Sequence, residues 1–440
     1  MFKRITGTRD ILPEEIAWWQ KKEKIARDIF SFYNYREIRP PLIEEAPLFN
    51  RSLGQSSEIV QKQMFIIERK KEFYALRPEG TACVVRAYIE NSLDKTQGFL
   101  KLYYIGPMFR AERPQKGRLR QFHHIGCEAI GSLDADLDAE VISLADNLLK
   151  NFSITGYKIR INSLGCAVDK KNFEQCLRSV VKDKLSRFCP DCQKRFKDNP
   201  LRILDCKQLG CREVLKKIDL QNSHLCSDCN AHFARVRADL KILGIDYEVT
   251  PYLVRGLDYY SRTVFEITHP DLGSQDALGA GGRYDSLVKE LGGPDVGAIG
   301  FALGMERLFL VSAFSSQPSA LSLVYIISLG EEAKKEGFKL LDNLRKAGIA
   351  ADTDYEGKSL KAALRKANDL KAKYVLMIGE NELKKSVVAL KDMASGVQRE
   401  IKQDNLIEDL KSIMNEKSQI QILPNPKSKI GILSRTKMKI

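Results

Sequence analysis

Two apolar segments on either side of a strongly basic loop constrain the fold of this chain most. Residues 99–112 and 120–130 have the composition of β-strands, and the loop between them carries Arg113, Lys116 and Arg118. Further strands are expected at 157–162, 248–268 and 277–280. Because these strands are far apart in the sequence, the pattern indicates long-range strand pairing and not a series of strand–helix–strand repeats.

The same strand-rich part lacks both common glycine-rich phosphate-binding loops, the Walker type and the dinucleotide type. A nucleotide bound here would therefore have its phosphates held by side chains. Arginine is suited to that task, because its planar guanidinium donates two parallel hydrogen bonds to an oxyanion. The basic loop offers several such side chains, and the alternative is a basic surface hairpin without a ligand.

Composition narrows the class of protein. The 440 residues include 71 Lys and Arg against 57 Asp and Glu, which gives a formal charge of +14. This excess favours a polyanionic partner such as a nucleic acid, and a merely solubilising charge is the alternative. The first residues lack the apolar run of a secretory signal, and no stretch has the roughly 20 apolar residues of a membrane span. We therefore expect a cytoplasmic protein with no membrane contact.

Three regions are expected along the chain. Residues 168–245 are charged, cysteine-containing and helical, which indicates an insertion within the first domain. Small and polar residues at 315–319 mark a linker, after which apolar strands alternate with charged helices, as in a compact α/β domain. We place the domains at 1–318 and 319–414, and expect the basic tail 415–440 to be loosely ordered.

Several sequence stretches occur in an order that is typical of one family. They are YYIGPMFRAERPQKGRLRQFHHIGCE at 103–128, LRPEGTA at 76–82, LVRGLDYYSRTVFE at 253–266, GAGGRYDSLVKELGG at 279–293 and GFALGMERL at 300–308. Together they resemble the class II aminoacyl-tRNA synthetases, in the form that histidyl-tRNA synthetases use. The first stretch is similar to motif 2 of that class, and Arg39-Pro40-Pro41 stands where the dimer-forming motif 1 belongs. Residues 357–372 resemble the family's anticodon-binding domain.

The resemblance implies a fold and an activity. The implied fold class is α+β, with an antiparallel sheet flanked by helices, a helical insertion and a C-terminal α/β anticodon-binding domain. The implied activity is histidine–tRNA ligation. ATP and L-histidine give histidyl-adenylate and pyrophosphate, and histidine is then transferred to the 3′ end of its tRNA. The implied assembly is a homodimer.

The resemblance also implies roles for individual residues. Histidine binding is expected at Glu79, Gly80, Thr81, His124, Glu128, Arg255, Tyr259, Tyr260 and Tyr284. ATP binding is expected at Arg110, Arg118, Phe122 and Arg307, with the Phe122 ring stacked on adenine. Contacts with the tRNA acceptor end are expected at Gln115, Lys116 and Arg120.

Arg255 and Arg110 are the expected catalytic residues. By resemblance, both neutralise the charge that builds on the α-phosphate when the histidine carboxylate attacks it. That carboxylate is already ionised at neutral pH, so the step needs no general base. Mg²⁺ is expected on the β- and γ-phosphates, whose charge exceeds what two arginines neutralise.

Two positions leave the site open to interpretation. His124 replaces the glutamine that is usual in the family, and a protonated imidazole would repel the substrate ammonium, which predicts weaker histidine binding at low pH. A substitution without kinetic effect is the alternative. Tyr259 and Tyr260 are expected on a strand, where neighbours face opposite sides, so one of them is a candidate for a structural role.

The cysteines suggest a second kind of site. Candidate ligands of a structural Zn²⁺ are Cys189, Cys192, Cys226 and Cys229, because two Cys-x-x-Cys pairs can supply four thiolates in a tetrahedron. Alternative ligands that lie between or near the pairs are Cys206, Cys211, His224 and His232. Reduced thiols that bind no metal are the competing interpretation, because the gap between the two pairs is wide.

Two other functions fit parts of the same pattern. The synthetase-like regulatory subunit of ATP phosphoribosyltransferase shares the catalytic fold. It lacks the C-terminal domain and usually loses the arginines, whereas Arg110, Arg255 and Arg307 are present here. A tRNA-binding module with an inactive site is the second alternative, and His124 is the feature that favours it. Adenylate formation would exclude both.

Overall fold

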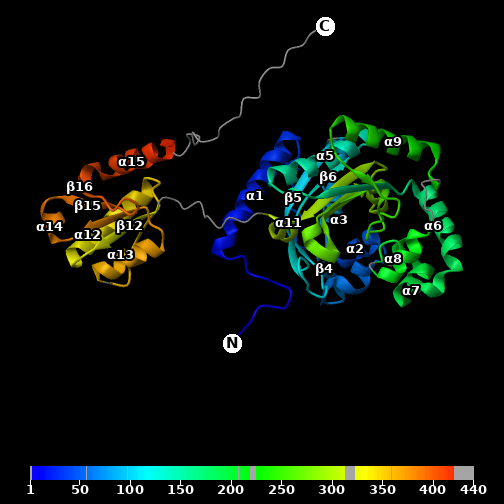
Figure 1. Cartoon of the computed structure of the whole chain (residues 1–440), viewed down its shortest axis with the longest axis horizontal. Coiled ribbons are helices and arrows are strands. Elements are labelled where there is room, and N and C mark those ends of the chain that lie inside the picture. Colours follow the sequence, from blue (N-terminus) through cyan, green and yellow to red (C-terminus); the bar gives the residue numbers. More distant parts are fainter. Residues whose placement is uncertain are drawn as a thin grey trace, which may run out of the picture. The chain divides into compact units, whose positions relative to one another are not determined.

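The computed structural model describes residues 2–55, 57–96, 98–206, 208–218, 224–312, 323–357 and 359–420. The chain divides into two compact units, Met1–Ser316 and Gln317–Ile440 (Figure 1). Each unit has its own sheet and its own core, and each is described by itself. Among the described residues, no helix combines the length and the apolar character that a membrane crossing requires.

An eight-stranded sheet organises the first unit, in the order β1-β5-β6-β11-β10-β9-β7-β8. All neighbours are antiparallel except the two edge pairs, β1 with β5 and β7 with β8. The strands are β1 Arg36–Glu37, β5 Leu100–Phe109, β6 Gln121–Ile130, β7 Lys158–Ser163, β8 Glu248–Val249, β9 Ser261–Thr268, β10 Ala277–Arg283 and β11 Ala298–Gly304. The expected antiparallel sheet, with hairpin partners β5 and β6, is confirmed.

Helices cover both faces of this sheet. One face packs against α1 (Pro13–Phe32), α5 (Ala135–Asn151) and α9 (Ser227–Ile242) in a core that includes Trp19, Leu144 and Phe265. The other face packs against α2 (Ala46–Leu53), α3 (Thr81–Glu90) and the part of the insertion that precedes α9. Successive strand residues point to opposite faces, so Cys127 of β6 lies in the first core, whereas its neighbour Glu128 faces the second layer.

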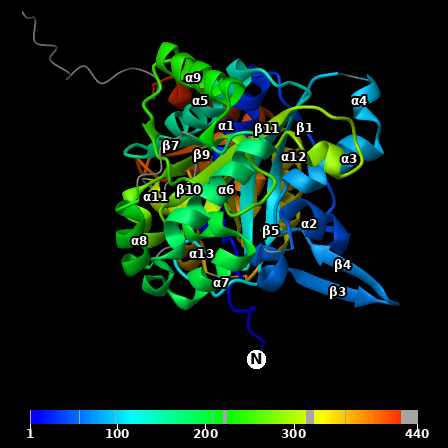
Figure 2. The same cartoon turned by 90° about the vertical axis from the view of Figure 1, so that its right-hand side faces the viewer.

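Smaller elements complete the first unit. They are α4 Leu93–Thr96, α10 Leu287–Glu290, α11 Met305–Val311 and a sheet of β2 Ile43–Glu45, β4 Glu72–Leu76 and β3 Phe65–Arg69. The β3–β4 hairpin projects from the body of this unit (Figure 2).

The insertion leaves the sheet after β7 and returns to it at β8. Its helices are α6 Ala167–Lys182, α7 Pro190–Asp198, α8 Leu209–Lys216 and α9. The two flanking strands pair in parallel, with Arg160 opposite Glu248, so the insertion begins and ends at one edge of the sheet. The last helix, α9, packs along α5.

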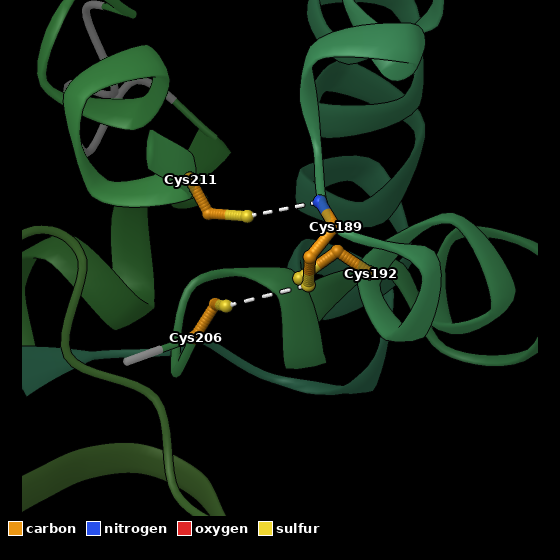
Figure 3. Close-up of side chains that lie close together, drawn as sticks. All are labelled: Cys189, Cys192, Cys206 and Cys211. Carbon is orange, nitrogen blue, oxygen red and sulfur yellow. Dashed lines mark hydrogen bonds between the residues drawn. The ribbon is translucent and has the colours of Figure 1, made fainter. Parts of the chain in front are cut away.

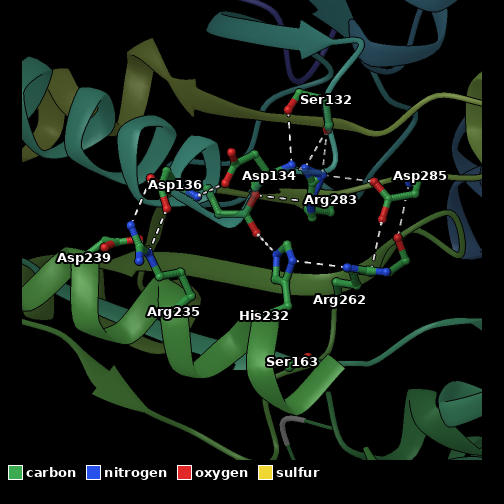
Figure 4. A network of polar contacts seen from close by, with 12 residues as sticks. Ser132, Asp134, Asp136, Ser163, His232, Arg235, Asp239, Arg262, Arg283 and Asp285 are labelled. Atoms are coloured by element: carbon green, nitrogen blue, oxygen red, sulfur yellow. Dashed lines mark hydrogen bonds and ion pairs between the residues drawn. The ribbon is translucent and has the colours of Figure 1, made fainter. Parts of the chain in front are cut away.

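A buried polar network fixes α9 to the sheet (Figure 4). Arg283 of β10 is fully buried, and its Nε lies 3.1 Å from a carboxylate oxygen of Asp138 on α5. The other Asp138 oxygen lies 2.8 Å from Nε2 of His232, whose Nδ1 lies 3.1 Å from Nη1 of Arg262. A carboxylate accepts and a guanidinium donates, so His232 carries its proton on Nε2 and accepts at Nδ1. His232 is therefore committed to this network and is not a free metal ligand.

The second unit is a five-stranded sheet in the order β13-β12-β14-β15-β16. Its strands are β12 Val324–Ser328, β13 Ala351–Thr353, β14 Tyr374–Ile378, β15 Val387–Asp392 and β16 Gln398–Lys402. Its helices are α12 Glu331–Lys346, α13 Leu360–Asp369, α14 Glu380–Lys384 and α15 Leu406–Ile420. The expected α/β alternation extends to β14 and is followed by the antiparallel hairpin β15–β16.

The structure corrects three details of the sequence prediction. Helix α15 reaches Ile420, so the first residues of the predicted tail are helical, while 421–440 and the linker 315–319 lie outside the described residues. The strand expected at 248–268 is two strands, β8 and β9, separated by irregular backbone. The helix expected from residue 302 begins at Met305 and is preceded by β11, whose two glycines conceal a strand. Gly300 is required there, because a Cβ at this position would overlap the Glu128 carboxylate.

Candidate active site

A cavity of about 300 Å³ opens on the sheet face that carries Phe122 and His124. Its walls include the following predicted residues: Glu79, Gly80, Thr81, Arg110, Arg118, Phe122, His124, Arg255, Tyr259, Tyr260 and Arg307. Alternation along β6 explains why Phe122 and His124 share a face, because residues two apart on a strand point the same way. Four separate stretches of sequence therefore meet at one site, whose volume suits a small ligand.

Glu128 lies one layer behind this wall, held by three hydroxyl groups. Thr81 Oγ1 donates to it over 2.7 Å, and the hydroxyls of Tyr284 and Tyr104 donate over 2.5 Å and 3.4 Å. Burial raises the pKa of Glu128 to about 8, and the nearby Glu79 adds to the rise, although the three hydrogen bonds oppose it. Glu128 and Tyr284 were both expected to bind histidine, and the structure places both behind the wall residues.

Glu79 joins the cavity to the start of α3. Its carboxylate oxygens accept hydrogen bonds from the backbone N–H groups of Thr81 and Ala82, over 2.6 Å and 2.9 Å. A carboxylate at a helix N-terminus also meets the positive end of the helix dipole. Burial nevertheless raises the pKa of Glu79, because these bonds do not fully replace water. A cationic ligand group in the cavity would restore the missing counter-charge.

Tyr259 and Tyr260 both line the cavity, as expected of histidine-binding residues, so neither is confined to the structural role for which one of them was a candidate. They precede β9 in irregular backbone, so the alternation of a strand does not apply to them. Their ring centroids are 4.7 Å apart, and Tyr259 also packs edge-on against Tyr284 at 5.7 Å. Tyr259 and Tyr260 thus form an aromatic wall that Tyr284 supports from behind.

Three arginines gather at the other end of the cavity. Arg118 Nη1 lies 3.0 Å from Glu112, and Arg307 donates from Nε to the carbonyl of Gly117 over 2.9 Å. Arg110 donates from Nε to the carbonyl of Pro78 over 2.9 Å. Burial lowers the pKa of Arg307 to about 10, and repulsion from Arg118 and Arg110 adds to the effect. The cluster carries more positive charge than its surroundings neutralise, so it is suited to an anion.

An aromatic surface lies beside this cluster. The guanidinium of Arg110 sits 5.3 Å from the centre of the Phe122 ring, a cation–π distance. Phe122 also contacts His124 edge-on, with 5.0 Å between ring centroids. A flat, apolar ring next to cationic groups can hold a base whose phosphates reach the arginines.

Arg255 lies in the same cavity and is paired with Glu266 of β9. Nη1 of Arg255 and Oε1 of Glu266 are 2.5 Å apart. Burial disfavours the charge of Arg255, but Glu266 and Asp205 outweigh this penalty and raise its pKa. Its Nε is buried and has no hydrogen-bond partner among the described residues. Arg255 therefore keeps a donor for a ligand.

His124 is neutral in this environment. Burial lowers the pKa of His124 well below the usual 6.5, and the positive charges of Arg110 and Arg307 lower it further. Its Nδ1 is buried, with no hydrogen-bond partner in the described part of the chain. The repulsion of a substrate ammonium that was expected at low pH therefore needs conditions far more acidic than neutral.

The basic loop between β5 and β6 contains a tight turn. Backbone groups of Gln115 and Arg118 bond to each other over 3.1 Å and 2.9 Å, which leaves Gln115 and Lys116 exposed at the tip. Arg120 points away from this tip, because its Nη1 donates to the carbonyl of Thr6 over 3.2 Å. Of the three residues expected at the tRNA acceptor end, two are available at the tip and Arg120 ties the loop to the N-terminal segment.

Comparison with known proteins identifies the family. The family model for histidyl-tRNA synthetase matches residues 7–308, and the model for the anticodon binding domain matches 323–413. The chain belongs to the histidyl-tRNA synthetase family. A histidine–tRNA ligase of Syntrophotalea carbinolica is 45% identical over 398 residues, which cover 90% of this chain and 95% of that protein.

Solved structures of this family have the same fold. The crystal structure of apo S. aureus histidyl-tRNA synthetase matches with a TM-score of 0.78 at 35% identity, covering 93% of this chain and 99% of that one. An ATP phosphoribosyltransferase regulatory subunit/histidyl-tRNA synthetase from Bacillus halodurans C matches with a TM-score of 0.63 at 21% identity, covering 86% and 98%. At that identity the second likeness shows a shared fold alone.

Several wall residues of this synthetase fold were not singled out from the sequence. They are Tyr104, Glu112, Arg202, Asp205, Glu266 and Glu306. Two of them are charged partners of predicted residues, Glu112 of Arg118 and Glu266 of Arg255. A buried arginine needs a counter-ion, so the predicted arginines require acidic partners. Spacing along the sequence does not identify which acidic residues these are.

The four predicted zinc ligands are not brought together. Cys189 and Cys192 lie with Cys206 and Cys211, whereas Cys226 and Cys229 lie with Cys166 and Asp169. In each group, one potential ligand atom per residue lies within 4.8 Å of all the others. The predicted ligand set is therefore corrected. A Cys-x-x-Cys spacing fixes the geometry within each pair, but the tertiary fold decides which further ligands each pair meets.

Proposed function

We propose that this chain is a histidine–tRNA ligase, which activates L-histidine with ATP and transfers it to the 3′ end of its tRNA. The observation that carries the proposal is the division of the cavity. One end is an arginine cluster beside an aromatic ring, and the other is a buried, acidic and tyrosine-lined pocket. A nucleotide triphosphate fits the first end, and a small cation with a polar ring fits the second.

The acidic end accounts for histidine. The Glu79 carboxylate is the counter-ion for the α-ammonium group, whose positive charge also favours ionisation of Glu79 itself. Glu128, with Tyr260 on the wall, recognises the imidazole, which has one donor and one acceptor in its neutral form. An amino acid without the matching ring atoms would form fewer hydrogen bonds in this buried end of the cavity, which penalises its binding.

The cationic end accounts for ATP. Phe122 stacks on the adenine, Arg110 binds the α-phosphate, and Arg307 with Arg118 binds the terminal phosphates. Mg²⁺ would be held here mainly by the phosphate oxygens, because in the described residues the groups of three or more potential metal ligands lie in the insertion and not on the cavity wall. When bound there, it would neutralise charge on the β- and γ-phosphates, with Glu112 available as a carboxylate partner.

The chemistry of activation follows from charge placement. The histidine carboxylate attacks the α-phosphorus, an acyl–phosphate bond forms, and pyrophosphate leaves with the bonding electrons. Arg255 and Arg110 stabilise the extra negative charge of the pentavalent transition state. Glu266 orients Arg255 for this task. A carboxylate nucleophile needs no base, and the carboxylates of this cavity bind or orient cations instead.

The remaining parts of the proposal concern tRNA and assembly. Gln115 and Lys116 meet the acceptor end, and the unit that matches an anticodon binding domain meets the anticodon, where unpaired bases can be read. The protein acts in the cytoplasm as a homodimer. The region around Arg39-Pro40-Pro41 supports a dimer surface, since Phe32, Leu42 and Ile43 are large, apolar and exposed there.

Histidine-dependent exchange of pyrophosphate into ATP tests the activation step. The assay uses all other amino acids as controls and Arg255→Ala as the inactive variant. Exchange that is specific to histidine and lost in the variant is the expected result. If the protein folds but shows no exchange, the function of a regulatory subunit is favoured instead. The 21% identical structure supports that function only through a shared fold.

A further inference from the structure

Four cysteines of the insertion converge on one point (Figure 3). The Sγ atoms of Cys189, Cys192, Cys206 and Cys211 all lie within 4.8 Å of one another, and those of Cys189 and Cys206 are 3.9 Å apart. A tetrahedral Zn²⁺ with Zn–S bonds of ~2.3 Å separates its sulfurs by ~3.8 Å. The spacing of the thiols therefore matches a zinc site before any rearrangement.

The backbone presents these thiols in a way that suits thiolates. Cys189 precedes α7 as its N-cap, Cys192 lies in the first turn of α7, and Cys211 lies in the first turn of α8. The N–H of Cys189 donates to Sγ of Cys211 over 3.2 Å. Helix N-termini and backbone N–H donors both stabilise negative charge on sulfur.

Neither disulfides nor ordinary core packing explains this arrangement. All four residues are free cysteines, and 3.9 Å between Cys189 and Cys206 is almost twice the ~2.05 Å of an S–S bond. Cysteines that serve as small apolar residues have no reason to point four sulfurs at one centre. Within α7, Cys192 is the buried residue, while Leu201, Ile203 and Leu215 of the following segment pack into the core of the first unit.

We propose that Cys189, Cys192, Cys206 and Cys211 bind one structural Zn²⁺. The second group is not part of this proposal. Its acidic member, Asp169, already accepts the backbone N–H groups of Cys166 and Cys226, over 3.3 Å and 3.0 Å, and Cys226 is exposed. Capping of backbone N–H groups by Asp169 thus explains why the residues of the second group lie together. Among the described residues, no such contact explains the four-cysteine group.

The zinc site has a consequence for the cavity. Arg202 and Asp205 lie on the cavity wall, and both belong to the segment between Cys192 and Cys206. Arg202 Nη2 is 3.1 Å from Asp258, the residue before Tyr259. Metal binding at the two ends of this segment would hold it against the cavity, so zinc loss should raise the KM for substrates as well as loosen the insertion.

Zinc content per chain tests the proposal directly. The full-length protein is purified without added metal, together with Cys192→Ser, Cys226→Ser and, as a control, Cys176→Ser, whose exposed thiol belongs to neither group. We expect Cys192→Ser to contain one zinc per chain fewer than the unmodified protein, and the other two variants to match it. An unmodified protein without zinc, or an unchanged content in Cys192→Ser, would overturn the proposal. Loss of the same zinc in Cys226→Ser would overturn it in favour of the ligand set predicted from the sequence, Cys189, Cys192, Cys226 and Cys229.

A second measurement avoids the risk that Cys192→Ser fails to fold. Thiol alkylation of the unmodified protein is followed by mass spectrometry before and after a strong chelator. The proposal requires Cys189, Cys192, Cys206 and Cys211 to become reactive together on chelation, while the alkylation of Cys176 stays the same. Reactivity that the chelator does not change in these four residues would contradict it.

Discussion

Nη1 of Arg255 and Oε1 of Glu266 lie 2.5 Å apart inside the cavity, on a loop and a strand that meet at the candidate active site. A charge-assisted bond of this kind fixes the plane of the guanidinium. Glu266 therefore decides which way the remaining donors of Arg255 point. The Nε of Arg255, buried and without a partner among the described residues, is one of those donors.

Glu266→Gln should slow histidine-dependent pyrophosphate exchange. Hydrogen bonds to charged groups contribute about 1.5–3 kcal/mol, so kcat should fall roughly 10- to 100-fold. Steady-state exchange assays measure the change. Glu248→Gln is the matched control, because Glu248 forms an exposed pair with Arg160 at 3.8 Å and should have no effect. Equal rates in all three proteins would show that Glu266 does not orient Arg255.

Asp138→Asn should destabilise the first unit. The substitution removes one of the two carboxylates that pair with the buried Arg283, Asp285 being the other, so it should cost part of the about 3–5 kcal/mol that breaking a buried pair costs. Asp136→Asn on the same helix is the control, since its pair with Arg235 is largely exposed and is worth at most about 1 kcal/mol. Thermal unfolding followed by circular dichroism compares the two. A shift of similar size in both variants would refute the role given to the network.

Glu128 should make stability depend on pH in an unusual direction. Its pKa is about 8 in the folded protein and near 4.5 when unfolded, so between these values the folded state holds one proton more. This contribution is present at acidic pH and is lost as the pH rises towards 8. Glu128→Gln should lack that loss, which amounts to a few kcal/mol, on the order expected for a shift of this size. Melting midpoints from pH 5 to 8.5 measure it, and parallel profiles would argue against a protonated Glu128.

His124→Gln should leave the pH profile of histidine binding unchanged between pH 6 and 8. The pKa of His124 is lowered well below 6.5, so the imidazole is neutral throughout this range. The KM for histidine in the exchange assay, measured for both proteins at several pH values, is the test. A KM that rises towards pH 6 in the unmodified protein alone would mean that His124 takes up a proton after all.

Lys116→Ala should affect tRNA binding alone, whereas Arg120→Ala should also affect the stability of the protein. Lys116 is exposed at the loop tip, so its loss should weaken tRNA binding a few-fold and reduce the salt dependence by about one ion, with unchanged exchange. Arg120 bonds to the carbonyl of Thr6, so its loss should also lower the melting temperature. Aminoacylation and binding at several salt concentrations separate them. Identical behaviour of the two variants would contradict the geometry of the loop.

The sequence predicts this site well where one motif contains the residue and also determines the sheet face to which its side chain points. Phe122 and His124 follow from alternation along one strand, and Arg110 follows from its position just after another. The prediction fails where contacts with another segment of the chain determine the position of a residue. Tyr260 was assigned to a strand that begins one residue later. Gly300 is unusual for a central strand, and the reason for it is a contact that the sequence does not show. The Glu128 carboxylate on the neighbouring strand leaves no room for a Cβ at this position.

The cysteines show the same limit. Spacing correctly identifies Cys189 and Cys192 as a pair, but it cannot say that the pair joins Cys206 and Cys211 instead of the distant second pair. That choice depends on how α7 and α8 pack within the insertion. Local chemistry is thus readable from the sequence, and the assembly of distant groups is a property of the fold.

The parallel pairing of β7 with β8 has a consequence for how this family can change. The insertion leaves and re-enters at neighbouring edge strands, with Arg160 opposite Glu248, so its length is not coupled to the register of the central strands. Lineages can lengthen, shorten or replace the segment while the catalytic sheet keeps its geometry. The same edge is a natural place to splice in a reporter domain, provided that α9 and its anchor at His232 are kept.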